Sequence, residues 1–440
     1  VDIDATGNND GTSWANAYTS LQAAITDGDA NSPAEIWVAE GTYKPGSSQS
    51  SYFEMKNLVE IYGGFDGTET DLSQRDFNTH ITVLSGEIGN AGIDDNINNI
   101  IKNFFTQGSP LGSSAILDGF TLTRGGSWNG SNYNSNGSAI YNYYASPIIR
   151  NCQFKDNNSL RGGAVYNYNS SATYINCTFS NNVAGQRGGA AENNSNDGNP
   201  TVSFVNSLFY GNWVNYGLGD GAAIMSGSST TTTKILNCLF YSNTCSGCTN
   251  PSGAVRLGGA MIDVENTIIW GNDGPEIYVS ATASNINNNI IDGGFSGGTN
   301  IIEEAPVFLD APNNDFRSPF CSPGINKGSN SNISGYSEDL DQNPRIVGGI
   351  ADIGPYEFQN GIELVTTDAT CVSGSDGSLS ITVIGGSYEY SLDGLTFSSS
   401  TSYTSLPPDD YDLYIKDLAN NCTSVQSFTI SAPNLTLSAS

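Results

Sequence analysis

The chain has 440 residues, of which 37% are hydrophobic and 13% charged, against about 25% charged residues in an average globular protein. Its 44 acidic residues outnumber 15 basic residues, which gives a net charge of −29. So acidic a surface repels phosphate backbones, which excludes nucleic acid as the main partner and disfavours an anionic membrane.

The first hundred residues predict a short helix followed by strands. Apolar residues follow Trp14 at helical spacing, at Tyr18, Leu21, Ala24 and Ile25. A helix at this point would cover the open end of a stacked β structure. Strands are expected at 35–39, 59–62 and 81–84.

Two short phrases alternate between Gly137 and Asn272, at steps of about 25 to 31 residues. One is Gly162-Gly163-Ala164-Val165, and the other is Asn176-Cys177-Thr178-Phe179. A single repeat of this length holds too few apolar residues to bury its own apolar face, whereas stacked repeats bury a continuous interior. The repeats therefore predict the stacked coils of a parallel β-helix. We expect residues 36–310 to form one right-handed parallel solenoid of about ten coils, roughly 48 Å long at ~4.8 Å per coil.

Side-chain alternation along each strand assigns the faces of these coils. We expect one aliphatic and one aromatic ladder inside the solenoid, formed by Ile140, Val165, Ala191, Ile224 and Val255 and by Phe154, Phe179, Phe209 and Phe240. Asn at the corners tolerates left-handed backbone, and stacked Asn side chains bond one another. The positions expected to point outward are Tyr141, Tyr166, Glu192, Met225 and Arg256.

The periodic phrases fade after Asp292, and 339–358 resembles a terminal segment. From Gly361 the sequence alternates Ser, Thr, Tyr and Leu, which predicts a small all-β module. The expected organisation is therefore a parallel β-helix domain over 1–360 and an Ig-like β-sandwich over 361–440.

The eight cysteines suit an oxidising, extracellular location. Cys152, Cys177 and Cys238 recur in coil register, which indicates small inward side chains. Cys245 and Cys248 are spaced for a local disulfide in a turn. No run of 18 apolar residues suggests a membrane span, and the opening at Val1 is typical of a mature part of a secreted protein.

Catalytic signals are weak. The sequence holds one histidine, His80, and carboxylates do not recur at the repeat step between Gly137 and Asn272, so we expect no enzyme activity. Asp339-x-Asp341-x-Asn343 resembles a calcium loop, but Pro344 occupies the position that needs Gly, which favours a turn network with Arg345. No cofactor is predicted, while calcium elsewhere stays an open alternative.

The most suggestive outward residues are tyrosines on two neighbouring coils. Aromatic rings exposed in this way stack on sugar rings, although a long turn could instead cover them. The candidate ligand contacts are therefore Tyr141, Tyr143, Tyr166 and Tyr168.

Two regions of the sequence resemble known families of Bacteroidota. The opening 11–18, the segment 36–43, and the pair 339–345 and 352–357 are similar to secreted right-handed β-helix proteins with a "choice-of-anchor" region, and the Gly-Gly-Ala phrases are similar to those of polymorphic outer-membrane adhesins. Residues 361–433 resemble the repeat of the gliding-motility surface adhesin (SprB-like), with Cys371, Gly385-Gly386 and Asn421-Cys422 at matching positions. This second resemblance implies a disulfide between Cys371 and Cys422.

The resemblances imply a multi-module, cell-surface or secreted protein exported by the type IX system, and they supply no catalytic residue. Our leading interpretation is a non-catalytic adhesin or stalk module that binds surface glycans or other extracellular surfaces. Its other partners would be further modules of the same polypeptide and the secretion machinery. A carbohydrate-active β-helix enzyme and a purely architectural spacer or filament subunit are the alternatives.

Overall fold

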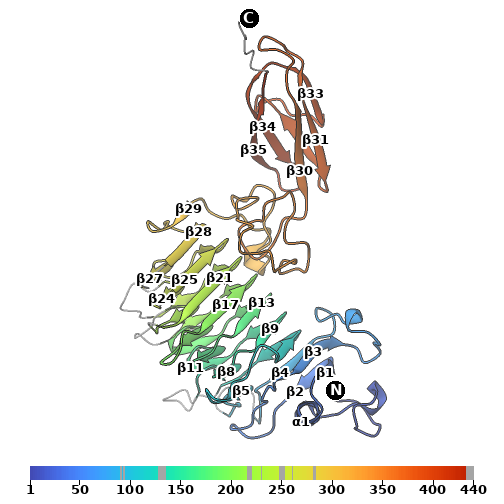
Figure 1. Cartoon of the computed structure of the whole chain (residues 1–440), viewed down its shortest axis with the longest axis vertical. Coiled ribbons are helices and arrows are strands. Elements are labelled where there is room, and N and C mark those ends of the chain that lie inside the picture. Colours follow the sequence, from blue (N-terminus) through green and yellow to red (C-terminus); the bar gives the residue numbers. More distant parts are fainter. Residues whose placement is uncertain are drawn as a thin grey trace, which may run out of the picture. The chain divides into compact units, whose positions relative to one another are not determined.

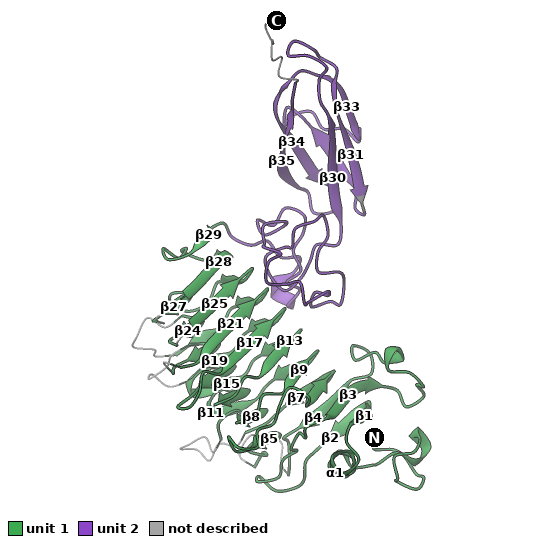
Figure 2. Ribbon diagram, in the orientation of Figure 1, with its two compact units in different colours: residues 1–304 green, residues 305–440 purple. Residues whose placement is uncertain are grey.

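The computed structural model describes residues 1–89, 92, 95–126, 135–215, 221–228, 230–246, 253–259, 261–280 and 284–432. Strands hold 41% of the residues and helices 5%, so the chain is all-β. It divides into two compact units, 1–304 and 305–440 (Figure 2).

Unit 1 is built on an 18-stranded sheet in which all pairings between strands are parallel. Successive coils add strands in chain order, so that β9, β13, β17 and β21 lie side by side (Figure 1). Its strands are β1 (Ala34–Ala39), β2 (Gly41–Tyr43), β3 (Val59–Phe65), β4 (Thr82–Ser85), β6 (Ile116–Asp118), β7 (Phe120–Thr123), β9 (Ile148–Arg150), β10 (Gln153–Lys155), β13 (Thr173–Ile175), β14 (Thr178–Ser180), β17 (Thr201–Val205), β18 (Leu208–Tyr210), β21 (Thr232–Leu236), β22 (Leu239–Tyr241), β25 (Met261–Glu265), β26 (Ile268–Trp270), β28 (Ser284–Ile291) and β29 (Thr299–Ile302).

Two smaller parallel sheets complete the coils. The seven-stranded sheet contains β5 (Ile101–Phe104), β8 (Ile140–Tyr143), β12 (Val165–Tyr168), β16 (Ala191–Asn194), β20 (Ile224–Ser226), β24 (Val255–Leu257) and β27 (Ile277–Val279). The four-stranded sheet contains β11 (Asn158–Arg161), β15 (Val183–Arg187), β19 (Trp213–Val214) and β23 (Thr244–Cys245). Parallel pairing thus extends from β1 to β29, which confirms the predicted parallel stacking.

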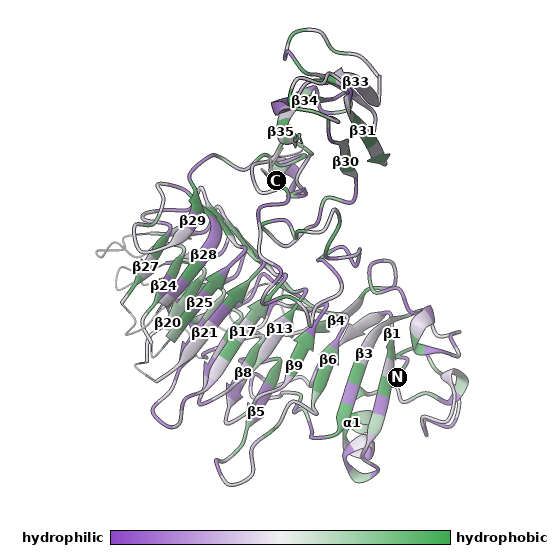
Figure 3. Ribbon diagram, turned by 45° about the horizontal axis from the view of Figure 1, so that its top comes forward, coloured by the Kyte–Doolittle hydropathy of each residue, from purple (hydrophilic) through white to green (hydrophobic). Residues whose placement is uncertain are grey.

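The predicted inner ladders are confirmed. Val165 pairs with Ile140 on one side and Ala191 on the other, and all three side chains are fully buried. The rings of Phe154 and Phe179 stack at 4.6 Å, and the same spacing continues to Phe209 and Phe240. Hydrophobic segments therefore recur on successive strands of unit 1 (Figure 3). Cys152, Cys177 and Cys238 are buried in this interior, as predicted.

Asparagines fix the corners of the coils in two ways. Asn151, Asn176, Asn206, Asn237 and Asn266 open the second phrase with φ between 47° and 54°, which is the left-handed backbone expected there. A second set, buried except for the half-buried Asn272, forms an asparagine ladder in which each Nδ2 donates to the Oδ1 of the next rung at 2.8 to 3.0 Å: Asn157, Asn182, Asn212, Asn243 and Asn272.

The asparagine ladder ends on a carboxylate. Asn272 donates its backbone N–H to Glu276 Oε1 at 3.0 Å and its side-chain Nδ2 to Oε2 at 2.6 Å. Burial raises the pKa of Glu276 from 4.5 to about 7. Glu276 therefore satisfies the last amide of the ladder, but its ionised form is penalised by burial.

Acidification is expected to stabilise unit 1 through Glu276. Between pH 4.5 and 7 the folded chain holds a proton that the unfolded chain has released, so this contribution to the free energy of unfolding falls as pH rises, by at most about 3 kcal/mol. The Tm of the parent should therefore drop more steeply from pH 5 to 7.5 than that of Glu276→Gln. Calorimetry checks this, with exposed Glu304→Gln as the control, and parallel pH slopes for parent and Glu276→Gln would contradict it.

The predicted N-terminal helix is present as α1 (Leu21–Ala30), preceded by the 3-10 turn η1 (Trp14–Asn16), while η2 (Leu72–Gln74) lies in a later loop. Ser20 caps α1 by accepting a hydrogen bond from the Ala23 N–H. Leu21, Ala24 and Ile25 are buried in the same core as the strands of unit 1, so α1 covers the amino-terminal end of that core.

Unit 2 contains two three-stranded antiparallel sheets and the 3-10 turn η3 (Ala311–Asn313). Side chains from both sheets, among them Leu379 and Leu413, share one core. The strands are β30 (Gly361–Thr367), β31 (Gly377–Ile384) and β33 (Ser402–Leu406) in one sheet, and β32 (Tyr388–Ser391), β34 (Asp409–Asp417) and β35 (Cys422–Ile430) in the other.

The division between the units falls after Glu304, earlier than the boundary predicted near Gly361. Phe320 explains the difference, because it is buried in the core of the antiparallel sheets and its ring lies 5.3 Å from that of Tyr388. The segment 305–360 therefore packs with the C-terminal strands of unit 2.

The predicted Cys371–Cys422 disulfide is wrong. Cys422 is bonded to Cys321, with a Cα–Cα distance of 6.1 Å, and Cys371 is an exposed free thiol. The cause is the packing of 305–360, which brings Cys321 to the start of β35. Cys371 instead lies in a turn that is closed by a bond from the Gly374 N–H to its carbonyl. Cys245 is disulfide-bonded, while its predicted partner Cys248 lies outside the described residues.

The segment predicted as a turn network forms one. Asp339 Oδ1 accepts from the N–H groups of Asp341 and Asn343, at 3.0 and 2.8 Å, and its Oδ2 accepts from that of Glu357. Arg345 donates to the carbonyl of Asp352 at 2.7 Å. The carboxylate of Asp339 is thus used by backbone donors.

Candidate functional site

The predicted ligand residues lie on the outer face of the seven-stranded sheet. Tyr141 is the register partner of Tyr166, and Tyr143 is the partner of Tyr168. The residues between them point inward, where Asn142 donates to Asn167 Oδ1 at 2.9 Å. These buried amide bonds hold β8 and β12 in register, and they thereby hold the tyrosine rings at the spacing of the strands.

The tyrosines form a stacked group together with Phe104 of β5. The ring of Tyr143 stacks on Phe104 at 4.7 Å and on Tyr168 at 5.5 Å, and Tyr141 stacks on Tyr166 at 5.7 Å. We call these five residues the aromatic face. Phe104 is 56% exposed, whereas Tyr141, Tyr143 and Tyr168 are half-buried. Because the rings stack on one another, the aromatic face presents mainly ring edges and phenol hydroxyl groups on three neighbouring strands.

Tyr166 does not belong to the exposed part of this surface, contrary to the prediction. It is only 3% exposed, because the guanidinium of Arg161 lies 5.4 Å from its ring centroid. Arg161 also forms an ion pair with Glu192, the next residue of the outer row, which is itself fully buried. Tyr166 and Glu192 thus point away from the solenoid interior but are covered by a side chain from β11.

Phe104 is not among the predicted ligand contacts, although the sequence around it matches the pattern of the repeats. Ile101-Lys102-Asn103-Phe104 has the same pattern as Ile140-Tyr141-Asn142-Tyr143, with an inward aliphatic residue and Asn and an outward aromatic residue. The repeat therefore begins one coil earlier than Gly137. The ammonium group of Lys102 lies 5.8 Å from the Phe104 ring centroid, which adds a cation at the rim of the aromatic face.

The aromatic face is suited to stacking and hydrogen bonding rather than to proton transfer. Burial raises the pKa of Tyr141, and it raises the pKa of Tyr166 to about 12. These phenols therefore stay neutral near pH 7. Exposed rings with hydroxyl groups bind flat apolar surfaces and bond to polar groups at the edge.

Carboxylates in coil register do occur, on strands that precede the repeats. Glu35 of β1 is the register partner of Glu60 of β3. Each carboxylate bonds an aromatic side chain of its own strand, since Trp37 Nε1 donates to Glu35 at 3.3 Å and Tyr62 donates to Glu60. This pair lies outside the repeats between Gly137 and Asn272, so the repeat pattern does not reveal it.

A nearby buried carboxylate is fully paired. Asp118 of β6 forms two ion pairs, one from Oδ1 to Arg75 at 2.8 Å and one from Oδ2 to Arg150. Asn151 donates to Oδ1 as well, at 2.8 Å. Such a cluster holds a buried charge by compensating it, which is a structural role.

His80 pairs with a different carboxylate. Its Nδ1 is 3.1 Å from Glu40, and this hydrogen bond raises the pKa of the imidazole. Within the described residues, no group of three or more His, Cys, Asp or Glu is placed to hold a metal ion. In the same residues, no helix is both long and apolar enough to cross a membrane.

Neither a protein-family model nor, at a significant level, any curated protein matches the chain.

Proposed function

We propose that the chain is a non-catalytic adhesin or stalk module of a secreted or cell-surface protein, and that its aromatic face binds glycans. The observation that carries the proposal is the stack of Phe104, Tyr143 and Tyr168 on adjacent strands, with Phe104 the most exposed. A row of rings at the spacing of the coils fits an extended chain of sugar units. Weak binding at one such face gains strength when several copies act together.

The sequence resemblances support the setting of this function. In this proposal, unit 1 is a right-handed β-helix of the kind found in secreted Bacteroidota proteins, because crossovers between parallel strands are nearly always right-handed. The two antiparallel sheets of unit 2 form an Ig-like module similar to the gliding-motility adhesin repeat. The protein would be exported by the type IX system and would act outside the cell as part of a longer polypeptide.

The test is binding to a glycan array followed by calorimetric titration of the best ligand. Tyr143→Ala removes the central ring of the stack and is expected to weaken binding at least fivefold, since an aromatic contact contributes about 1 kcal/mol or more. Tyr143→Phe keeps the ring and should retain most of the affinity. Tyr210→Ala, which removes a half-buried ring from β18 in the 18-stranded sheet, is the matched control.

Three outcomes would count against the proposal. Full binding by Tyr143→Ala would exclude the aromatic face as the site. Release of reducing sugar by the purified protein, abolished by Glu60→Gln without loss of folding, would replace the adhesin with a carbohydrate-active enzyme at the Glu35–Glu60 pair. An array without any bound glycan would favour the architectural spacer.

A further inference from the structure

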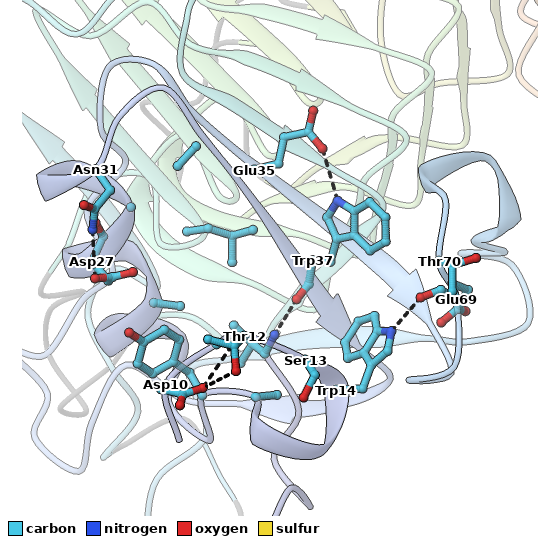
Figure 4. Close-up of a pocket in the computed structure, with 18 residues that line it drawn as sticks. Asp10, Thr12, Ser13, Trp14, Asp27, Asn31, Glu35, Trp37, Glu69 and Thr70 are labelled. Carbon is cyan, nitrogen blue, oxygen red and sulfur yellow. Dashed lines mark hydrogen bonds between the residues drawn. The ribbon is translucent and has the colours of Figure 1, made fainter. Parts of the chain in front are cut away.

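A second candidate site lies at the amino-terminal end of unit 1. A cleft of about 620 Å³ opens between the segment 10–18, helix α1 and strand β1 (Figure 4). Its volume falls within the range of roughly 300 to 1,000 Å³ that is usual for small-molecule sites. We call it the N-terminal cleft. It shares no residue with the aromatic face, and its inference does not depend on the function proposed above.

One wall of the N-terminal cleft is aromatic and held in place. The indoles of Trp14 and Trp37 lie 6.5 Å apart with their planes tilted by 41°. Trp37 stacks on Phe65 at 5.0 Å, and Trp14 donates its Nε1–H to the carbonyl of Glu69 at 2.9 Å. Because these contacts hold both indole rings in place, the ring surface that lines the cleft is rigid before any ligand binds.

The remaining walls are acidic. The carboxylates are oriented by hydrogen bonds: Asp10 accepts from Thr12 Oγ1, Asp27 accepts from Asn31 at 3.0 Å, and Glu35 accepts from Trp37. Lys and Arg do not occur among the described residues that line the cleft. The cleft is therefore negatively charged near pH 7.

Polar side chains complete the lining. Thr12, Ser13 and Thr70 carry hydroxyl groups that both donate and accept hydrogen bonds. Figure 4 shows Glu35 and the two tryptophans on one side of strand β1, and Asp10, Asp27 and Asn31 on the other. A ligand that uses all of these walls needs a flat apolar face, several hydroxyl groups and a positive charge.

We propose that the N-terminal cleft binds an amino sugar that carries a free amine. The carbon face of the pyranose ring stacks on Trp14 or Trp37, the ammonium group is held by the carboxylates, and the hydroxyls bond the polar rim. The charge then distinguishes this ligand from neutral sugars, because an ammonium group gains both from the carboxylates and from the indole ring. An N-acetylated sugar keeps the ring but loses the charge.

The test is titration of the whole chain with glucosamine near neutral pH and low salt, read by calorimetry and by tryptophan fluorescence. Glucosamine is expected to bind at least tenfold more tightly than N-acetylglucosamine or ethanolamine, and added salt should weaken it. Equal binding of glucosamine and N-acetylglucosamine would overturn the role of charge. Equal binding of glucosamine and ethanolamine would overturn recognition of the sugar ring.

Three variants locate the site. Asp27→Asn should weaken glucosamine binding at least threefold, whereas Asp29→Asn on the same helix, which does not line the N-terminal cleft, should leave it unchanged. Glu35→Gln provides a second carboxylate test if Asp27→Asn folds poorly. Parent-like affinity in both carboxylate variants would overturn the assignment.

Discussion

Val165→Asp is expected to unfold unit 1. Val165 is fully buried between Ile140 and Ala191 in the inner ladder, so the new carboxylate would have no water and no cationic partner. Burying such a group costs several kcal/mol, which is comparable to the whole stability of a typical domain. Circular dichroism should show that unit 1 of the variant is already unfolded near room temperature, so that the main thermal unfolding transition is lost.

The control for this variant places the same charge on the surface. Gln153 of β10 is exposed, so Gln153→Asp should change the free energy of unfolding by less than about 0.5 kcal/mol. A Tm for Val165→Asp within a few degrees of the parent would show that Val165 does not face a closed interior.

Removal of the Cys321–Cys422 disulfide should have the second large effect. The bond joins residues 101 positions apart, and closing a loop of about 100 residues contributes about 4.7 kcal/mol in the chain-entropy model. Cys321→Ser combined with Cys422→Ser should therefore lower the stability of unit 2 by about 4 kcal/mol, as measured by urea denaturation.

Cys371→Ser is the matched control, because Cys371 is exposed and free. Its stability should equal that of the parent. Peptide mapping without reduction offers an independent check, and a peptide linking Cys371 to Cys422 would refute the observed pairing.

The sequence predicts the parts of this fold that repeat. Inward residues such as Val165 and Phe179 are constrained by both neighbouring coils, so the same residue type recurs at each step and reveals both the face and the register. The corner asparagines are similarly visible because few other residues tolerate left-handed backbone.

The features that the sequence does not predict depend on contacts that occur only once in the structure. Arg161 covers Tyr166 through a long side chain from a different strand, and alternation along a strand carries no information about such a cover. The Cys321–Cys422 bond depends on how 305–360 packs, which cysteine spacing alone does not determine. The N-terminal cleft joins residues as distant as Asp10 and Thr70, so no local motif marks it.

In the asparagine ladder, the rise from one coil to the next does not depend on the number of residues in the coil. Its consecutive rungs are 25, 30, 31 and 29 residues apart, yet their amide bonds all fall between 2.8 and 3.0 Å. Each rung therefore resets the register, so residues added to a turn need not displace the coils above it. Evolution can accordingly lengthen or diversify the surface turns of one coil at a time, while the stack keeps a constant rise.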